Sequence, residues 1–572
     1  MPALSVIAPA YNQESTITGS ITEIARRLDA LGLDYELIVV SDGSTDATLD
    51  RLREFGHPRV RVTGYTRNLG KGYALRTGSA LATGDLVAWI DSDLDLDPSL
   101  IDDFIAEQRR GGWDIVVGSK RHPDSTIDYP ARRRAYSWMF QQLTHLLFRL
   151  DIRDTQVGMK LFRREVLDDV LPSLVVKRYA FDIEVLAVSR AFGHERMTEH
   201  PIALEYQFTG SGVNWRAIAN ALWDSAAIFY RLRVLRYYDR QHRLTERVRQ
   251  LRRDLPMPSL TVALAPEVVD DGVRRTVDGI RRQTPDGTAV MVVTGADGAA
   301  QVEGATVTAL PGLGEGARLA HAVRAARTDA VALLDSGSDP TGSWAGTAVA
   351  LLAAPEVGAV VGPSAPDLRG SPASAAGGIL SESRLGVGSA RVRFHVGRLR
   401  EVDDFPATNL FARTGVLRDV LDSGGRLDDG LCRDLRRRGL TVMCSPDVSV
   451  THRPVPLWHA YLGRVHALGR TRGALTWRGR MPRLVHLLPV ALLVLLLLGI
   501  PAGLAGGAWL TAWLGLIGLY VLAVLALGAL TFILHRRLAL VMRVMGGAVS
   551  SHLAFAAGWL RGLASYPFSR GR

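Results

Sequence analysis

Cysteine is almost absent from this sequence: Cys432 and Cys444 are the only two among 572 residues. Two isolated thiols supply neither a disulfide framework nor a paired metal-ligand motif, so we expect a reducing compartment. The N-terminal stretch "MPALSVIAPAYNQE" also lacks a basic leader and a long apolar run. We therefore expect no cleaved signal peptide and interpret this stretch as a first strand.

Acidic residues are outnumbered by basic ones, with 57 Asp and Glu against 68 Lys and Arg, which gives a formal net charge of +11. Such a balance favours an anionic partner, whether a lipid head group, a phosphate-bearing substrate or a nucleic acid. Nucleic acid is excluded because no binding motif or aromatic platform accompanies the charge. The length predicts three to four units of about 150 residues each.

Charge is missing altogether between Leu487 and Leu534. This length predicts two transmembrane helices of about 20 residues each, within 484–535, because the uncharged run is too long for a single span. Arginines flank both ends, which predicts a multi-pass protein of the cell membrane with both soluble domains in the cytoplasm. For 536–572 we expect an interfacial helix and a basic tail rather than a third span.

The remainder predicts two α/β domains. Residues 1–235 alternate strand-like runs with helical stretches, the pattern of a mostly parallel sheet covered by helices. Residues 236–257 continue an arginine-rich linker helix that begins near residue 231. A solvated linker fits this composition, and so does a helix resting on anionic lipid, which the membrane segment downstream favours. Residues 258–475 form the second domain.

The second domain repeats the first in weakened form. "LTVALAP" repeats "LSVIAP", and "ARTDAVALLDSG" repeats "ATGDLVAWIDSD", at the same places in the order of elements. An internal duplication explains both matches. The copy has lost acidic residues, because Asp42 aligns with Gly295 and Asp93 aligns with Gly337.

Residues 85–97, "DLVAWIDSDLDLD", place several carboxylates directly after an apolar strand. The carboxyl end of a parallel strand is where open α/β sheets bind ligands. Carboxylate oxygens in a loop suit Mg²⁺ or Mn²⁺, with remaining positions filled by water and a diphosphate. Asp91, Asp93 and Asp95 are the candidate ligands.

Three other interpretations of this loop compete. A calcium loop of the EF-hand type needs Gly and Glu where Leu96 and Asp102 stand, so it fails. A phosphatase of the haloacid-dehalogenase type looks for Thr or Val where Asp95 stands. Helix capping accounts for Asp97 but leaves Asp91 and Asp93 unexplained.

Eight motifs then occur in the order and spacing of a known family. "PAYNQE", "VVSDGSTD", "NLGKGYALRTG" and "DSD" resemble the family 2 glycosyltransferases of the GT-A fold. "GSKR", "DTQVGMKLFRREV", "RYAFDIEVL" and "GSGVN" resemble more specifically the polyprenyl (dolichyl) phosphate hexose synthases, the glucose and mannose enzymes. The resemblance covers about residues 1–230. In one departure Gly212 stands where the family often has Lys, which removes one phosphate contact.

The resemblance implies a nucleotide sugar of the UDP-glucose or GDP-mannose type, polyprenyl phosphate and membrane lipids as partners. The residues that would bind the nucleotide sugar are Pro9, Tyr11, Glu14, Asp42 and Lys71. Asp91 and Asp93 would bracket the diphosphate and the metal, with Asp95 as a third ligand. The residues that would face the sugar and phosphates, or stand at the position of the family's catalytic carboxylate, are Gln156, Lys160, Asp182 and Glu184.

An acceptor phosphate would be collected by the basic side chains of Lys120, Arg121, Arg133 and Arg134. For the arginine triplet 132–134, a solvated surface fits equally well. A phosphate monoester with a second pKa of about 6 is already an anion at neutral pH and needs no general base. A sugar hydroxyl would need one, from Asp182 or Glu184.

The sequence thus predicts a metal-dependent inverting glycosyltransferase that moves a hexose from a nucleotide sugar to polyprenyl phosphate at the cytoplasmic membrane face. The alternative is transfer to a saccharide hydroxyl in bacterial cell-wall or capsule synthesis, a cell-envelope role. The second domain would then be a non-catalytic binding or assembly module. Its "FPATNLFARTGV" region resembles the acceptor half of rhamnosyl- and galactofuranosyl-type members, with Asp428 and Asp429 at the usual base position. A processive synthase is disfavoured because Gln-x-x-Arg-Trp is absent.

Overall fold

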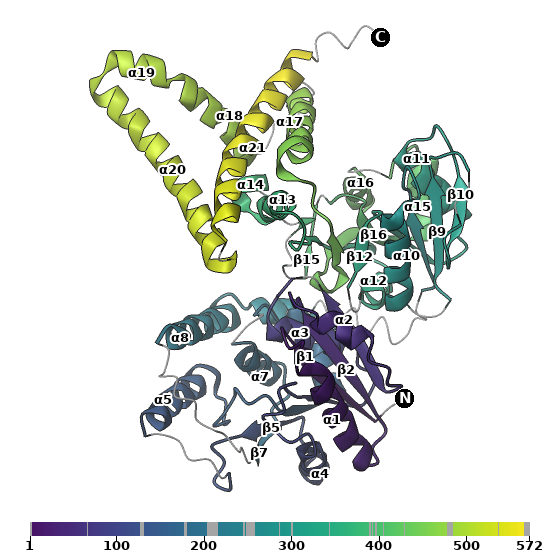
Figure 1. Cartoon of the computed structure of the whole chain (residues 1–572), viewed down its shortest axis with the longest axis vertical. Coiled ribbons are helices and arrows are strands. Elements are labelled where there is room, and N and C mark those ends of the chain that lie inside the picture. Colours follow the sequence, from purple (N-terminus) through teal and green to yellow (C-terminus); the bar gives the residue numbers. More distant parts are fainter. Residues whose placement is uncertain are drawn as a thin grey trace. The chain divides into compact units, whose positions relative to one another are not determined.

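The computed structural model divides the chain into two compact units, residues 1–362 with 397–450, and residues 363–396 with 451–572 (Figure 1). The residues that it describes are 3–65, 67–125, 131–176, 180–202, 215–243, 246, 258–284, 287–298, 301–341, 344–387, 391, 393–394, 397, 399–403, 405–427, 430–476, 484–535 and 537–565.

The first domain is built on a seven-stranded sheet in the order β3-β2-β1-β4-β6-β5-β7. Its strands are β1 (Leu4–Ala10), β2 (Tyr35–Asp42), β3 (Val60–Tyr65), β4 (Leu86–Trp89), β5 (Ile115–Ser119), β6 (Lys160–Arg163) and β7 (Met197–Pro201). Only β6 is antiparallel to its neighbours in this sheet. The strands β1 and β2 are buried on both faces, which is why they are almost continuously apolar.

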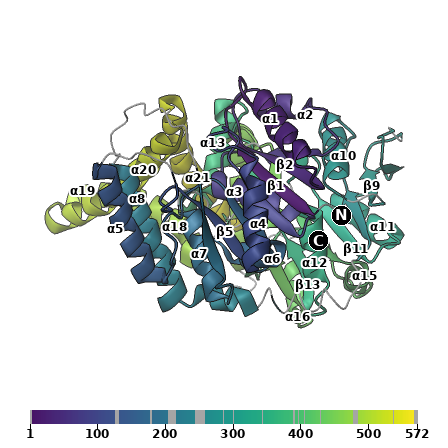
Figure 2. The ribbon, with the colours of Figure 1, turned by 90° about the horizontal axis from the view of Figure 1, so that it is seen from below.

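Helices cover both faces of this sheet (Figure 2). They are α1 (Ile17–Ala30), α2 (Thr48–Arg53), α3 (Lys71–Leu81), α4 (Leu100–Gly111), α5 (Ala131–Phe148), α6 (Arg164–Val170), α7 (Phe181–Ala191) and α8 (Trp215–Phe229), with the shorter turns η1 (Leu171–Ser173) and η2 (Tyr230–Val234). Helix α1 illustrates how an apolar face packs each helix against the sheet. Its buried residues Ile17, Ile21, Ile24 and Leu28 recur at helical spacing and pack on the core of β1 and β2.

The second domain repeats this topology. Its sheet has the order β10-β9-β8-β11-β16-β13-β17-β15, which matches the first sheet strand for strand before the added edge strand β15. The strands are β8 (Leu260–Leu264), β9 (Ala289–Thr294), β10 (Thr306–Ala309), β11 (Ala330–Leu334), β13 (Val357–Val361), β15 (Arg400–Glu401), β16 (Asn409–Arg413) and β17 (Thr441–Cys444). As β6 does in the first sheet, β16 runs antiparallel to both neighbours.

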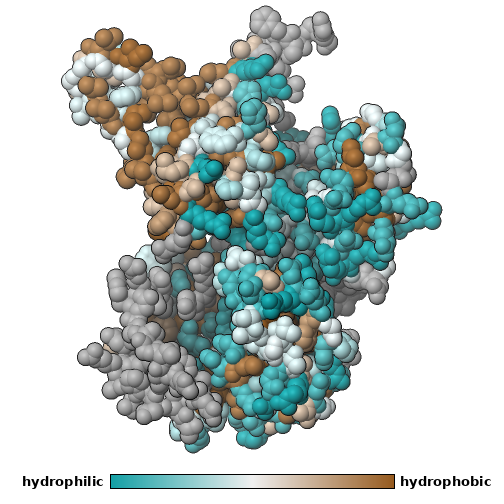
Figure 3. Space-filling model, viewed as in Figure 1, coloured by the Kyte–Doolittle hydropathy of each residue, from teal (hydrophilic) through white to brown (hydrophobic). Residues whose placement is uncertain are grey.

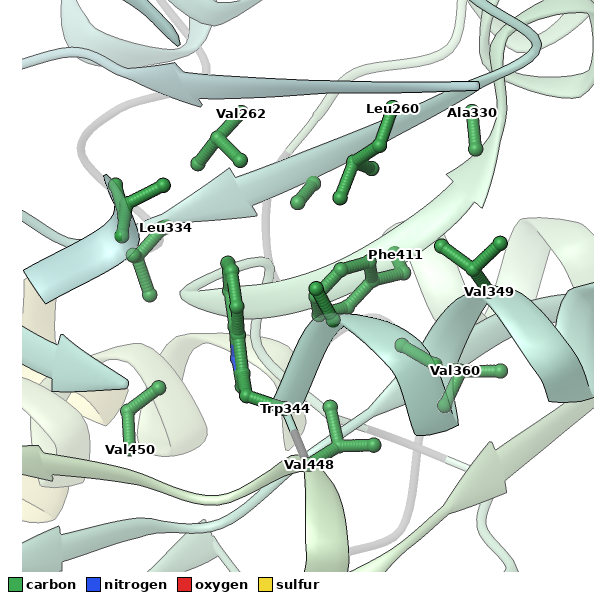
Figure 4. Close-up of a cluster of buried hydrophobic side chains, with 14 of the residues drawn as sticks. Leu260, Val262, Ala330, Leu334, Trp344, Val349, Val360, Phe411, Val448 and Val450 are labelled. Atoms are coloured by element: carbon green, nitrogen blue, oxygen red, sulfur yellow. The ribbon is translucent and has the colours of Figure 1, made fainter. Parts of the chain in front are cut away.

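The helices of the second domain are α10 (Asp271–Gln283), α11 (Glu315–Ala325), α12 (Trp344–Leu352), α15 (Thr414–Asp422) and α16 (Leu431–Arg437), with the short turn η4 (Pro446–Val448) and the strand β12 (Ser338–Pro340) outside the sheet. The core lies between α12 and the sheet (Figure 4). Trp344 stands at its centre against Phe411, with ring centroids 4.6 Å apart.

Strand register supports the duplication residue by residue. Leu4 of β1 pairs with Leu86 of β4, and Leu260 of β8 pairs with Ala330 of β11. Counting along the paired strands from these residues gives further equivalent pairs, namely Asp42 and Gly295, Asp91 and Asp335, and Asp93 and Gly337. The chain therefore carries two mixed α/β domains in tandem, the second a degenerate copy of the first.

The second unit is mainly helical. Its elements are β14 (Ser364–Pro366), α13 (Pro372–Glu382), α14 (Arg384–Val387), β18 (Val450–His452, which begins at the unit boundary), η5 (Leu457–Tyr461), α17 (Leu462–Thr476), α18 (Leu484–Leu497), α19 (Gly499–Ala505), α20 (Gly507–His535) and α21 (Leu538–Ser565). Apolar side chains gather over α20 (Figure 3).

Two of these helices, Gly507–His535 and Leu538–Ala564, are long and apolar enough to cross a membrane. The pair Leu488–Leu497 and Gly499–Ala505, bent by 44°, raises the number to three if it forms one span. Because residues 538–564 form one such helix, length and composition allow a third span where the sequence favoured an interfacial helix. That choice stays open.

Glycines allow α17 and α21 to touch backbone to backbone. Gly469 and Gly473 face α21, while Gly558 and Gly562 face α17. A Cβ atom at any of these four positions would lie less than 3.0 Å from a backbone atom of the other helix. The two Gly-x-x-x-Gly pairs thus interlock, as in close helix pairs of membrane proteins.

We expect Gly558→Ala to destabilise the second unit by about 1–3 kcal/mol, because the added methyl forces two helix backbones apart. The matched control is Gly515→Ala on α20, where a Cβ would meet nothing within 4 Å. Thermal unfolding of the full chain in detergent measures both variants. Equal melting temperatures for the two variants would contradict the interlocked packing.

Candidate functional site

The candidate site lies at the carboxyl ends of β1, β2 and β4, where the loops after these strands are tied together. Asn12 accepts a hydrogen bond from the backbone N–H of Thr45 at 2.8 Å, and Glu14 accepts one from Ala47 at 2.9 Å. The carbonyl of Pro9 accepts from Ser92 Oγ at 2.7 Å, next to Asp91. Tyr11 is exposed on the same loop. Pro9, Tyr11 and Glu14, which the sequence predicts to bind the nucleotide sugar, therefore lie together at this edge of the sheet.

Asp42 is buried and orders the turn before α3. Its carboxylate accepts hydrogen bonds from Tyr65 Oη at 2.8 Å, from the Leu69 N–H at 2.9 Å and from the Gly70 N–H at 3.0 Å. The glycine is required, because its φ of 102° is unfavourable for other residues. The sequence predicted that Asp42 receives hydrogen bonds from a nucleotide. In this structure it receives them from the protein.

Asp91 and Lys71 form an ion pair in the middle of the site. Lys71 is the first residue of α3, and Asp91 follows β4. Burial acts to lower the pKa of Lys71, but the carboxylates of Asp91 and Asp182 outweigh it, so the pKa is raised. Gly158 makes room for this pair, because a Cβ there would fall within 3.0 Å of the Asp91 carboxylate.

Asp93 and Asp95 lie exposed at the outer end of the same loop. Desolvation and the nearby charges of Asp91 and Asp95 raise the pKa of Asp93. Leu94, between them, has a φ of 63°, a strained value for a branched residue. Such strain is typical of functional loops. The three carboxylates therefore repel one another in a loop whose conformation is fixed by its surroundings.

A second ion pair lies deeper. Lys160 on β6 is 1% exposed and donates to Asp182 Oδ1 at 2.5 Å and to the Val157 carbonyl at 2.6 Å. The charge of the Asp182 carboxylate also helps to raise the pKa of Lys71. Charges of opposite sign thus alternate through the site in the order Asp91, Lys71, Asp182 and Lys160, and Asp93 adds a second carboxylate beside Asp91. The structure brings these five predicted residues together.

Glu184 is not brought to this cluster. Its side chain is fully buried and accepts hydrogen bonds from the Val175 and Val176 N–H groups and from Tyr238 Oη, beside Arg231 Nη1 at 3.4 Å. Burial raises the pKa of this carboxyl. Among the described residues, the partners of Glu184 are groups of the protein itself, so the structure does not bring this carboxylate to the charge cluster, and its role as a candidate base stays a prediction.

Of the remaining predicted residues, three side chains are described and the others lie outside the described residues. Gln156 is exposed, with its N–H bonded to Asp154. Lys120 is half-buried, and Arg121 donates to the Arg153 carbonyl at 3.1 Å, which holds the neighbouring loop. The side chains of Arg133 and Arg134, and the residues Gly212, Asp428 and Asp429, lie outside the described residues.

The second domain replaces most of these groups. Gly295 stands at the position of Asp42, and the guanidinium of Arg318 lies where a side chain at Gly295 would be. Lys71, first in α3, corresponds to Glu315, first in α11. Strand register places Leu410 where the first domain has Lys160. Asp93 is replaced by Gly337, so of the four site positions compared between the two sheets, which hold Asp91, Asp93, Lys71 and Lys160 in the first, the second keeps the charge only at Asp335.

A divalent metal fits the donor set of the first domain. Three carboxylates within one short loop are the hard oxygen ligands that Mg²⁺ and Mn²⁺ prefer, and their mutual repulsion calls for a cation. Within the described ranges, no three His, Cys, Asp or Glu side chains converge on one point. Lys71 supplies the positive charge beside Asp91 in this arrangement.

Sequence reasoning missed several residues that build the site. Gly72 lies against Phe181, since a Cβ on it would come within 3.0 Å of that ring, so α3 and α7 touch directly beside Asp182. Tyr65 bridges Asp42 and Tyr73, with ring centroids of the two tyrosines 5.3 Å apart. The only signal for these contacts is the pair of glycines flanking Lys71, which permits close approach.

Comparisons with known proteins agree with the geometry. Residues 5–171 match the family model described as "Glycosyl transferase family 2". The chain is 32% identical over 207 residues to Glycosyltransferase AglD of Haloferax volcanii, which covers 35% of this chain and 33% of that protein. It is 36% identical over 203 residues to the dolichyl-phosphate beta-glucosyltransferase of Drosophila melanogaster, covering 32% of this chain and 61% of the relative.

A solved structure, glucosyl-3-phosphoglycerate synthase from Mycobacterium tuberculosis in complex with Mn²⁺, uridine-diphosphate and phosphoglyceric acid, matches at 23% identity and a TM-score of 0.31. The match covers 40% of this chain and 78% of that one. The chain spans one third to about three fifths of the length of the two curated relatives named above. The domain that carries the charge cluster is thus similar, over residues 5–171, to the family 2 glycosyltransferases.

Proposed function

We propose that this protein transfers a hexose from a nucleotide sugar to polyprenyl phosphate with inversion at the anomeric carbon. The observation that carries the proposal is the alternation of charge from Asp91 to Lys160, with Asp93 as a further carboxylate, at the strand ends of a family 2 domain. A nucleoside diphosphate carries clustered negative charge, and a sugar leaving it increases that charge. The two lysines and a metal held by the carboxylates are suited to both states.

Each group has a distinct part in this chemistry. Asp91, Asp93 and Asp95 would hold Mg²⁺ or Mn²⁺, which would offset charge on the departing diphosphate. Lys71, which pairs with Asp91, would bind the same phosphates. Asp182 pairs with Lys160 and orients it in a buried position. Direct attack by the acceptor on the opposite face of the sugar inverts the anomeric centre.

Exposed apolar side chains support a lipid acceptor. Helices α5 and α8 lie side by side in the first domain (Figures 1 and 2). Between them they expose Trp138, Met139, Leu146 and Trp223, the last at 77% of its surface. Such a patch marks a surface for an apolar partner, and Trp favours the boundary between lipid and water. The apolar helices α20 and α21 favour the same location at a membrane.

The relatives support the acceptor's class. The curated relative from Drosophila melanogaster is named for transfer of glucose to dolichyl phosphate, a polyprenyl phosphate. The basic stretch from residue 231 supports lipid contact less directly. Arg231 is turned inward on Glu184 and Tyr238, and the stretch is described only at 231–243 and 246. We place both soluble domains on the cytoplasmic side, where nucleotide sugars are available.

A saccharide hydroxyl is the second candidate acceptor, and Asp182 is the observation that favours it. Its carboxylate is the only predicted base that reaches the site, since Glu184 is enclosed. As a base, Asp182 would have to give up its ion pair with Lys160, which leaves a buried lysine with the Val157 carbonyl but without an opposite charge. A phosphate acceptor avoids this cost because it needs no base.

We expect Asp91→Asn and Asp93→Asn to reduce sugar transfer by at least about 100-fold, because each removes charge from the metal and diphosphate site. Chelation by EDTA should have the same effect, and added Mn²⁺ should reverse it. Asp335→Asn is the matched control, since Asp335 occupies the position of Asp91 in the second sheet. Radiolabelled sugar entering an organic phase measures transfer. Full activity in EDTA would refute the metal, and equal loss in Asp335→Asn would assign activity to the second domain.

The acceptor can be identified from the pH dependence of Asp182→Asn. With a phosphate acceptor, we expect a lower rate whose acid limb still follows the acceptor's second pKa of about 6. With a hydroxyl acceptor, loss of the base should cost about 100-fold or more and flatten the acid limb. Transfer rates from pH 5 to 9 distinguish the two, provided that circular dichroism shows both proteins folded.

Substitution of Trp223 by Glu tests the apolar face of α5 and α8. Transfer to long-chain polyprenyl phosphate in liposomes should fall on the order of 10-fold, since a charge replaces an interfacial ring. Transfer to a water-soluble short-chain isoprenoid phosphate should stay within about 2-fold of the original, because Trp223 lies outside the charge cluster. A parallel loss on both acceptors would contradict membrane contact by this face.

A further inference from the structure

Two side chains of α3 leave the first domain and contact a loop of the second. Arg76 Nη2 lies 2.6 Å from Asp447 Oδ2. Tyr73 Oη lies 3.3 Å from the Pro446 carbonyl and 3.4 Å from Ser449 Oγ. The residues 445–449 form this loop, which we call the docking loop, and both domains belong to the same compact unit. None of these contacts is used by the sugar-transfer chemistry.

The ion pair is buried, which makes it dependent on both partners. The side chains of Arg76 and Asp447 are 8% and 15% exposed. Burial acts to lower the pKa of Arg76, but the Asp447 carboxylate outweighs it and the pKa is raised. Arg76 Nη1 also donates to the Leu174 carbonyl at 3.1 Å. Removing either partner would leave an uncompensated charge in the interior, which is strongly unfavourable.

The second domain holds its docking loop rigidly. Asn409 donates to the Val448 carbonyl at 2.7 Å and accepts from the indole N–H of Trp344 at 2.8 Å. Val448 itself is buried in the core beside Trp344 (Figure 4). Gly362 lets the loop pass, because a Cβ there would overlap the Val448 carbonyl. The core of the second domain thus fixes where the Asp447 carboxylate stands.

The other end of α3 builds the candidate site. Gly70, immediately before the helix, donates to Asp42, and Lys71 pairs with Asp91. Gly72 packs on Phe181, next to Asp182. Arg76 lies little more than one turn along the same helix from Lys71, and a helix transmits position along its axis as a rigid element. A shift of the docking loop would therefore move the lysine and the glycine that contact the two site carboxylates.

We propose that the second domain, having lost its own charged site, positions α3 of the first domain through the docking loop. Arg76 and Asp447 are positioning residues, and Tyr73 assists them. This role deepens the proposed sugar transfer and, where it concerns rate, rests on it. It also accounts for the retention of a folded copy that lacks the site's charges. The strand before the docking loop, β17, occupies the place of β7 in the first sheet.

The test is Asp447→Asn in the full chain, which keeps the shape of the side chain and removes its charge. Hydrogen exchange over residues 69–81 should become faster on the order of 10-fold, because the anchor of α3 is weakened. The kcat/KM for the nucleotide sugar should fall on the order of 10-fold. Asp447→Glu, which restores the charge, should recover most of both losses. Asp434→Asn is the matched control, because Asp434 pairs with Arg437 within α16 and should change neither value.

The outcomes separate this inference from the proposed function. Unchanged exchange over 69–81 in Asp447→Asn overturns the positioning role, as does faster exchange with unchanged transfer. If the unaltered protein transfers no sugar, the proposed function fails. Binding of UDP and of GDP in the presence of Mn²⁺ then decides the inference, with weaker binding in Asp447→Asn expected and equal binding overturning it. If Asp447→Asn does not fold, Tyr73→Phe, which removes one hydroxyl, takes its place with the same readouts.

Discussion

The site depends on how the first turn of α3 is held. The carboxylate of Asp42 accepts the N–H groups of Leu69 and Gly70, and so satisfies donors that no helix partner could reach at this end. This places Lys71 against Asp91 and Gly72 against Phe181. One buried acid therefore sets the distance between the loops after β2 and β4. A glycine with a φ of 102° makes the turn possible.

Burial separates two classes of carboxylate in the first domain. Asp42 and Glu184 are both enclosed, and each is saturated by backbone N–H groups and a tyrosine hydroxyl. Asp93 and Asp95 remain exposed on a strained loop, where desolvation and like charges raise the pKa of Asp93. A bound cation can reduce that repulsion, whereas a carboxylate whose oxygens already accept hydrogen bonds from the protein gains little from one. Proximity to the strand ends alone does not distinguish these two classes.

The sequence predicted the α/β class, the tandem copy and the family, because strand patterns and the motif order depend on local chemistry. It also grouped Asp91, Asp93, Asp182, Lys71 and Lys160. It could not predict that Glu184 turns away from Asp182, although two residues on a helix separated by one position point in different directions. Nor could it show that Asp42 bonds to the protein, since Leu69 and Gly70 lie far along the chain. Long-range hydrogen bonds leave no periodic signal.

The second domain differs from the first in the charged residues of the site and keeps the core. The strand order and register are kept, and Trp344 and Phe411 fill the interior, while Glu315 and Leu410 stand where the first domain has its two site lysines. Reversing one charge and deleting another would be costly in a domain that must bind a diphosphate, but they cost a scaffold little. This copy does offer the first domain one buried charge, the carboxylate of Asp447, which a loop at the end of β17 holds against Arg76. The same fold that places several charged side chains in the first domain can, in the second domain, place one charged side chain against its neighbour.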